Sequence, residues 1–197
     1  GDLAALDVTL GAGARPDAGS TCPLRYTPLL LACGAREYTQ WEIKSAEMDA
    51  FDFYQAAYRN LPQRVELVDR LLTAGADPRA GYKYGTALHI ASSCGRTDIV
   101  RALLARGAEV GALDHRFCTA LHCAAFMGTA DVVAALIEAG ADLDIQNHSG
   151  NTALSRAAWK GHTSIVAELT KAGAELDIQN KAGDTALMIS AAYRGHT

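Results

Sequence analysis

Two histidines and two cysteines lie within nine positions of this 197-residue chain: His115, Cys118, His122 and Cys123. Imidazole nitrogens and thiolate sulfurs are the ligands that structural zinc takes most often. The chain has no Cys-x-x-Cys pair, no His-Glu-x-x-His, no Gly-rich phosphate loop and no Gly-x-Ser-x-Gly. These four side chains can therefore serve a metal only if the elements that carry them bring them together.

Those elements follow a strict repeat. Thr86, Thr119, Thr152 and Thr185 recur at one constant interval, each is followed by Ala-Leu, and an earlier copy begins at Thr27. A second landmark, two mostly apolar pairs followed by Gly-Ala, occurs at 67–76, 99–108, 132–141 and 165–174. A fixed period of this length indicates a stack of similar structural units.

The pattern within one period predicts two short helices. Each Thr suits a helix N-cap, because its hydroxyl can accept from the free N–H groups of the first turn. Small residues such as Ala91 follow, and a glycine such as Gly95 then breaks the chain. The apolar pairs at 99–104 form one stripe on a second helix, which Gly107 ends. Neither helix can bury its apolar face alone, so neighbouring units must stack.

The Thr-Ala-Leu-His tetrapeptides, the Ala-Ala pairs, Gly161-His162 and the Leu-Leu-x-x-Gly-Ala endings resemble the ankyrin repeat family. The resemblance covers the chain except for one insertion. It implies an all-α solenoid of stacked helix–turn–helix units, in which the first helices line a concave face and the segments between units form hairpin fingers.

In this register we expect six segments. Residues 1–26 hold the second helix of a partial unit and a finger, with that helix at 1–10, and residues 180–197 hold the first half of another, as if cut from a longer array. Between them lie repeat units at 27–80, 81–113, 114–146 and 147–179.

The unit at 27–80 carries an insertion at about 34–64. The stretch of chain from Thr27 to Gly75 is more than twice as long as the equivalent stretch from Thr86 to Gly107. Six of the chain's thirteen aromatic residues lie in the insertion, with helical spacing between 51 and 61. A flexible linker would not carry them. The added helix either covers the flank of its own repeat or docks a partner.

The repeat also accounts for the four residues that could bind zinc. His122 belongs to the recurring tetrapeptide, as does His89, and Cys123 falls on a core position. We therefore expect structural hydrogen bonds within or between units, with no metal, no cofactor and no catalytic residue.

Composition excludes several other classes. Hydrophobic residues make up 49% and charged residues 20%, and the net charge is −4, which disfavours a disordered chain and a basic nucleic-acid clamp. No apolar run is long enough to span a membrane. The five cysteines are odd in number and show no paired spacing, which indicates a reducing compartment. We expect an intracellular, cytoplasmic location, with the nucleus as the alternative.

Function should lie where the repeat does not dictate the residue. The resemblance places such positions at the finger tips and at the end of each first helix. Phe126 and Trp159 share one register in consecutive units, and stacking does not require large apolar groups there. The predicted partner-binding residues are Tyr82, Lys83, Tyr84, His115, Arg116, Phe117, Phe126, Met127, His148, Trp159, Lys160, Tyr193 and Arg194. Neighbouring positions on the same face are Ser93, Cys94, Ser149, Asn151, Lys181 and Asp184.

This face is basic although the chain is acidic. Five cations (Lys83, Arg116, Lys160, Lys181 and Arg194) stand against Asp184. The sequence thus predicts a non-catalytic scaffold that binds a protein or peptide, with an acidic segment and apolar anchors as its partner. Two alternatives remain open: a regulatory array of a larger enzyme, such as a kinase, or of a channel, and a self-association module.

Overall fold

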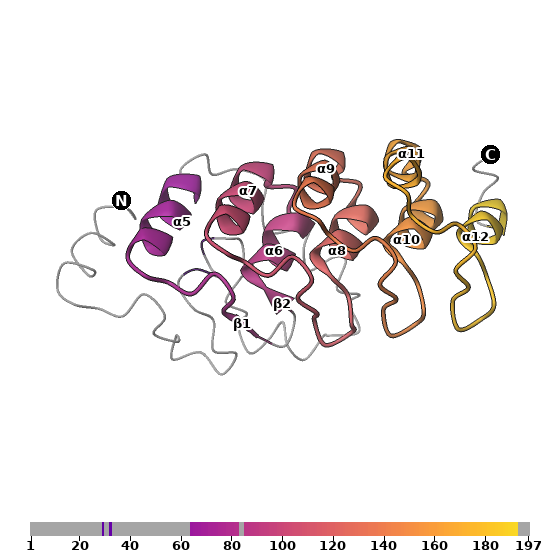
Figure 1. Cartoon of the computed structure of the whole chain (residues 1–197), viewed down its shortest axis with the longest axis horizontal. Helices are drawn as coiled ribbons and strands as arrows, with labels where there is room; N and C mark the ends of the chain where they lie inside the picture. Colours follow the sequence, from indigo (N-terminus) through magenta and orange to yellow (C-terminus); the bar gives the residue numbers. More distant parts are fainter. Residues whose placement is uncertain (1–28, 30–31, 33–63, 83–84, 193–197) are drawn as a thin grey trace, which may run out of the picture.

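Short helices in two parallel rows make up most of the described chain (Figure 1). The computed structural model describes residues 29, 32, 64–82 and 85–192. One row holds α5 (Arg64–Thr73), α7 (Thr97–Ala105), α9 (Ala130–Glu138) and α11 (Thr163–Lys171). The other holds α6 (Ala87–Ser93), α8 (Ala120–Met127), α10 (Ala153–Lys160) and α12 (Ala186–Ala192). This is the predicted all-α solenoid of helical pairs.

The recurring threonines begin the helices of the second row. Thr86, Thr119 and Thr152 have extended backbone and are the N-caps of α6, α8 and α10. The Thr119 hydroxyl accepts from the backbone N–H of His122 at 3.4 Å, and Thr152 accepts likewise from Ser155 at 3.3 Å. The predicted capping bond is confirmed at Thr119 and Thr152, whereas Thr86 occupies the N-cap position without a hydroxyl bond to a backbone N–H.

Glycine ends two of these helices. Gly128 and Gly161 follow α8 and α10 with φ of +80° and +76°, a left-handed backbone that side chains with a Cβ disfavour. The chain can therefore turn at once into the second helix of the unit.

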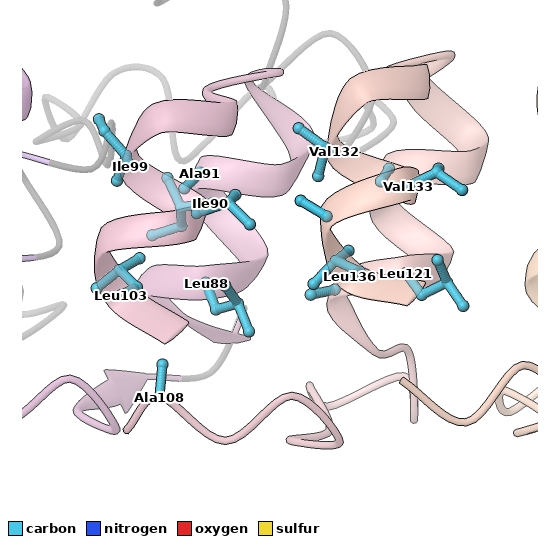
Figure 2. Close-up of a cluster of buried hydrophobic side chains, with 14 of the residues drawn as sticks. Leu88, Ile90, Ala91, Ile99, Leu103, Ala108, Leu121, Val132, Val133 and Leu136 are labelled. Carbon is cyan, nitrogen blue, oxygen red and sulfur yellow. The ribbon is translucent and has the colours of Figure 1, made fainter. Parts of the chain in front are cut away.

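The core is a continuous layer between the two rows. Alanines at 91, 124 and 157 are fully buried, so helices of adjacent units approach closely. Figure 2 shows the stripe of the second helices pointing into this layer, with Ile99, Leu103, Val132 and Leu136 among its labelled side chains. The predicted stripe is confirmed, but it is narrower than expected, since Leu104, Ile137 and Val166 are only partly buried.

Loops between units project from one side of the stack as fingers (Figure 1). Asp114, Asn147 and Asn180 share one register, and the side-chain oxygen of each accepts from the backbone N–H groups two and four residues later, at 2.7–3.0 Å. β1 (Gly81–Tyr82) pairs antiparallel with β2 (Gly85–Thr86), and within the described chain these are the only strands. The expected hairpin fingers are thus present.

Several predicted features lie outside the described residues. These are the helix at 1–10, most of the insertion at 34–64 with its helix at 51–61, and the side chains of Lys83, Tyr84, Tyr193 and Arg194. In the unit that carries the insertion, Leu29 and Ala32 are helical and buried in the same core as Val68 and Leu71.

Candidate protein-binding surface

Two buried histidines join consecutive units. The backbone N–H of Thr119 donates to Nδ1 of His122 at 3.1 Å, so Nδ1 is an acceptor and Nε2 carries the proton. Nε2 then donates to the Asn151 carbonyl of the next unit at 3.0 Å. His89 repeats this arrangement one unit earlier, with Thr86 at 3.1 Å and the Cys118 carbonyl at 2.9 Å. The predicted structural hydrogen bonds are confirmed.

Burial keeps both imidazoles neutral. Desolvation lowers the pKa of His122 to about 4 and also lowers the pKa of His89. A charged ring would additionally turn a proton on Nδ1 toward the N–H group that now donates to it. Both nitrogens of each ring are therefore committed to the fold.

The neighbouring thiols are equally unsuited to metal or nucleophilic chemistry. Burial raises the pKa of the Cys118 thiol, and desolvation raises the pKa of Cys123 to about 12. Thiolate is the form that binds metals and attacks electrophiles. Among the residues that the structure describes, no group of three or more His, Cys, Asp or Glu side chains could hold a metal ion.

Large aromatic side chains meet where α8 and α10 end. The rings of Phe126 and Trp159 stack with centroids 5.5 Å apart and planes 27° from parallel. Trp159 remains 41% exposed. The ammonium of Lys160 lies 4.4 Å from the Phe126 centroid and 4.7 Å from that of Trp159, within the range of cation–π attraction. Two successive units thus present one continuous aromatic and cationic patch.

A second aromatic contact lies on the fingers. Phe117 stacks on His148 of the following finger, with centroids 6.1 Å apart, and is 52% exposed. Its φ of +58° is left-handed, which is unusual for a bulky residue and costs energy. The Phe117 ring is therefore held outward by the finger rather than drawn into the core.

Arg156 also belongs to this surface, and the sequence interpretation missed it. Position 156 shares its register with Ile90, Cys123 and Ile189, so the pattern favours an apolar residue there. Its guanidinium lies 4.3 Å from the centroid of the Phe126 ring, on α8 of the preceding unit. A basic residue in a core register was the sequence signal that could have revealed it.

A cavity of about 240 Å³ opens beside this arginine. It extends between the second-row helices and two fingers, and its lining residues are Phe126, Asn151, Ser155, Arg156, Trp159, Asn180, Asp184 and Ile189. We call this surface the inner face: the cavity together with Lys160, Phe117 and His148.

The structure brings together part of the predicted set. Phe126, Trp159 and Lys160 meet on the inner face, and Phe117 meets His148. Met127 is partly buried at the end of α8, whereas His115 and Arg116 are exposed on a finger. Tyr82 lies on β1. Ser93 is not available to a partner, because it is buried and its hydroxyl donates to the His89 carbonyl at 2.9 Å.

Comparison with known proteins agrees with this architecture. A family model described as ankyrin repeats (3 copies) matches residues 53–147 and 135–197. No curated protein matches the chain. In the described part of the chain, no helix combines the length and the apolar character needed to cross a membrane. Since the family model covers more than half of the sequence, the chain belongs to the ankyrin repeat family.

Proposed function

We propose that this chain is a non-catalytic scaffold that binds a protein or peptide on its inner face. Ankyrin repeats are generally protein–protein interaction modules. The proposal adds the location of the binding surface and the character of the partner.

The stacked pair of Phe126 and Trp159 carries the proposal. Interface energy concentrates in Trp, Tyr and Arg side chains that a partner can bury. Trp159 keeps 41% of its surface exposed although its ring is already fixed against Phe126. A side chain that is rigid before binding loses little conformational entropy when a partner covers it.

Charge supports an acidic partner. Lys160 and Arg156 lie over the Phe126 ring, and Arg116 and Lys181 are exposed on two fingers. Opposite charge on a partner would raise the association rate and orient the complex. The partner we propose therefore has an acidic segment and one or two apolar anchors.

The experiment is affinity capture from cell extract with three forms of the immobilised chain: wild type, Trp159→Ala and Leu176→Ala. Leu176 is the control, because it is 51% exposed and lines a different hollow, together with Val166 and Leu187. We expect a protein that wild type and Leu176→Ala retain and that Trp159→Ala loses.

The captured protein is then purified and its affinity measured directly. If Trp159 is a hot spot, the Trp159→Ala variant should bind the partner about 30-fold more weakly than wild type does. Its helical content and melting temperature should stay nearly unchanged. If Trp159→Ala binds every captured protein as well as wild type does, the proposal is wrong.

A further inference from the structure

The unit that begins at Thr152 departs from the histidine arrangement of the two units before it. Ser155 stands at the register of His89 and His122. Its hydroxyl stays within its own unit, donating to the Thr152 carbonyl at 3.0 Å. The next carbonyl in the series after Cys118 and Asn151 is that of Asp184, one period further along the chain. The Ser155 side chain does not reach the Asp184 carbonyl.

The cavity lies at this departure. Ser155 and Asp184 both line it, together with Asn151 from the preceding finger. At the two earlier junctions an imidazole fills the space between a first helix and the carbonyl of the next finger. Replacing an imidazole with a hydroxymethyl group removes most of that volume. Serine at this register therefore leaves unfilled a part of the hollow of about 240 Å³.

An incompletely paired arginine faces the same hollow. The Nε atom of Arg156 is buried and makes no hydrogen bond. One of its terminal nitrogens lies 3.9 Å from the Cys118 sulfur, a weak acceptor. Within the described chain, no carboxylate is close enough to form an ion pair with Arg156. A buried guanidinium N–H without an acceptor is costly to the free protein.

We propose that the cavity receives one carboxylate side chain, Glu or Asp, from the partner, with Arg156 as its principal donor. This inference rests on the proposed function and names the chemistry recognised at that surface. The carboxylate would accept from the terminal guanidinium nitrogens of Arg156, in a charge-assisted hydrogen bond. Phe126 holds the guanidinium from one side, which fixes its direction before the partner arrives.

The charges around the cavity fit an anionic guest on balance. Arg156 and Lys160 contribute two positive charges, and Asp184, which lines the cavity, contributes one negative charge. Asp184 should therefore weaken binding of the guest carboxylate without preventing it. A cationic guest would meet two like charges against one opposite charge.

Capped amino acids test the site on the whole chain without knowledge of the partner. The probe is N-acetyl-glutamate N′-methylamide, and its control is the equivalent glutamine derivative. NMR follows the Nε–H signal of Arg156 and the indole N–H of Trp159 during titration. We expect saturable shifts with the glutamate probe, with a Kd of about 1 mM, and none that saturate with glutamine.

Two substitutions separate site chemistry from folding. Ser155→His introduces the residue found at positions 89 and 122 and should occupy the space beside Arg156, removing the response. Arg156→Ile introduces the residue found at positions 90 and 189, so the fold should persist while the Trp159 signal no longer responds. Asp184→Asn should strengthen binding by about threefold.

The inference is overturned if the glutamate and glutamine probes shift the NMR signals equally, or if no signal shifts up to about 20 mM probe, far above the expected Kd. It is also overturned if the glutamate shifts persist in Ser155→His, or if Asp184→Asn binds the glutamate probe more weakly. The captured partner distinguishes it from the proposed function. If Trp159→Ala loses the partner and Arg156→Ile retains it fully, the binding surface stands and the carboxylate site does not.

Discussion

Two neighbouring junctions of the same stack are closed in different ways. Between the units that begin at Thr119 and Thr152, His122 bridges helix and finger, and the space is filled. At the following junction Ser155 bonds only within its own unit, and a cavity remains. Fingers are joined at both junctions, by the His148 N–H to the Arg116 carbonyl at 2.8 Å and by the Lys181 N–H to the Ser149 carbonyl at 3.0 Å. The open junction has in addition the bond from Gln146 to the Gln179 carbonyl at 2.9 Å.

The residue at this one position of the repeat can therefore either bond two units together or leave a binding cavity between them. Histidine there is buried and makes a hydrogen bond to the next unit. Serine makes no such bond and leaves room for a side chain of a partner. Because each unit contacts only its neighbours, such a change affects one junction and leaves the rest of the stack intact.

The greatest loss of stability is expected from His122→Ala, compared with Ser155→Ala. His122→Ala removes the bonds to Thr119 and Asn151 and leaves a buried void, so the free energy of unfolding should fall by about 2–4 kcal/mol. Ser155→Ala removes one local bond and should cost about 0.5–1 kcal/mol. Urea denaturation followed by circular dichroism measures both. Equal losses would mean that the histidine bridge does not distinguish the two junctions.

A pH dependence should follow from the same histidine. In the unfolded chain the His122 pKa is near 6.5, and in the fold it is about 4. Stability contributed by the neutral ring is complete above pH 6.5, falls as the unfolded chain takes up the proton, and reaches its lower limit near pH 4. The loss is about 3 kcal/mol. The lowered pKa of His89 adds a loss in the same direction.

The measurement is the unfolding free energy at pH 7, 5.5 and 4, for wild type and for His122→Gln. Subtracting the variant from wild type removes the contribution of the carboxylates, which titrate in both proteins. A difference that stays constant from pH 7 to pH 4 would contradict the buried, neutral state of His122.

A structural feature could be predicted from the sequence where it depends on residues that recur in several repeat units. The threonine caps, the buried alanines and the bridging role of His89 belong to positions that recur from unit to unit, so pattern alone predicts them. Phe126 and Trp159 also share a register, which predicts neighbouring positions. Their 5.5 Å stacking depends on rotamers and on the spacing of units, which the pattern does not specify.

Arg156 was not predicted because binding residues were expected only at positions where the repeat is variable. The relevant anomaly lies at a position where the repeat is regular: Ser-Arg stands at 155–156, whereas His-Ile and His-Cys occupy 89–90 and 122–123. Even with that signal, the sequence does not show a cavity. A void depends on how far neighbouring side chains relax into the space.

A pair of glycines tests the open junction from the side of the fingers. Gly150 and Gly183 share one register on successive fingers, with φ of +79° and +87°. A Cβ at Gly150 would lie 2.7 Å from the backbone nitrogen of Lys181, whereas a Cβ at Gly183 meets nothing within 4 Å. Both Ala variants carry the left-handed penalty of about 1–2 kcal/mol, and Gly150→Ala should lose about 1–2 kcal/mol more. Chemical denaturation of the two variants measures the difference, and equal costs would show that the contact between fingers does not hold this junction.

Ser155→His is expected to stabilise the protein, by a smaller amount than His122→Ala destabilises it. The new imidazole can accept from the Thr152 N–H and donate to the Asp184 carbonyl, as His122 does with Thr119 and Asn151. It would also reduce the void. Against this, it approaches Arg156, and its own pKa must fall as it is buried. The net gain should be about 1 kcal/mol, which differential scanning calorimetry would record as a melting temperature about 2–4 °C higher. A gain in stability together with loss of the glutamate response would show that the open junction trades cohesion for binding, whereas a destabilised variant would mean that serine is required there for packing.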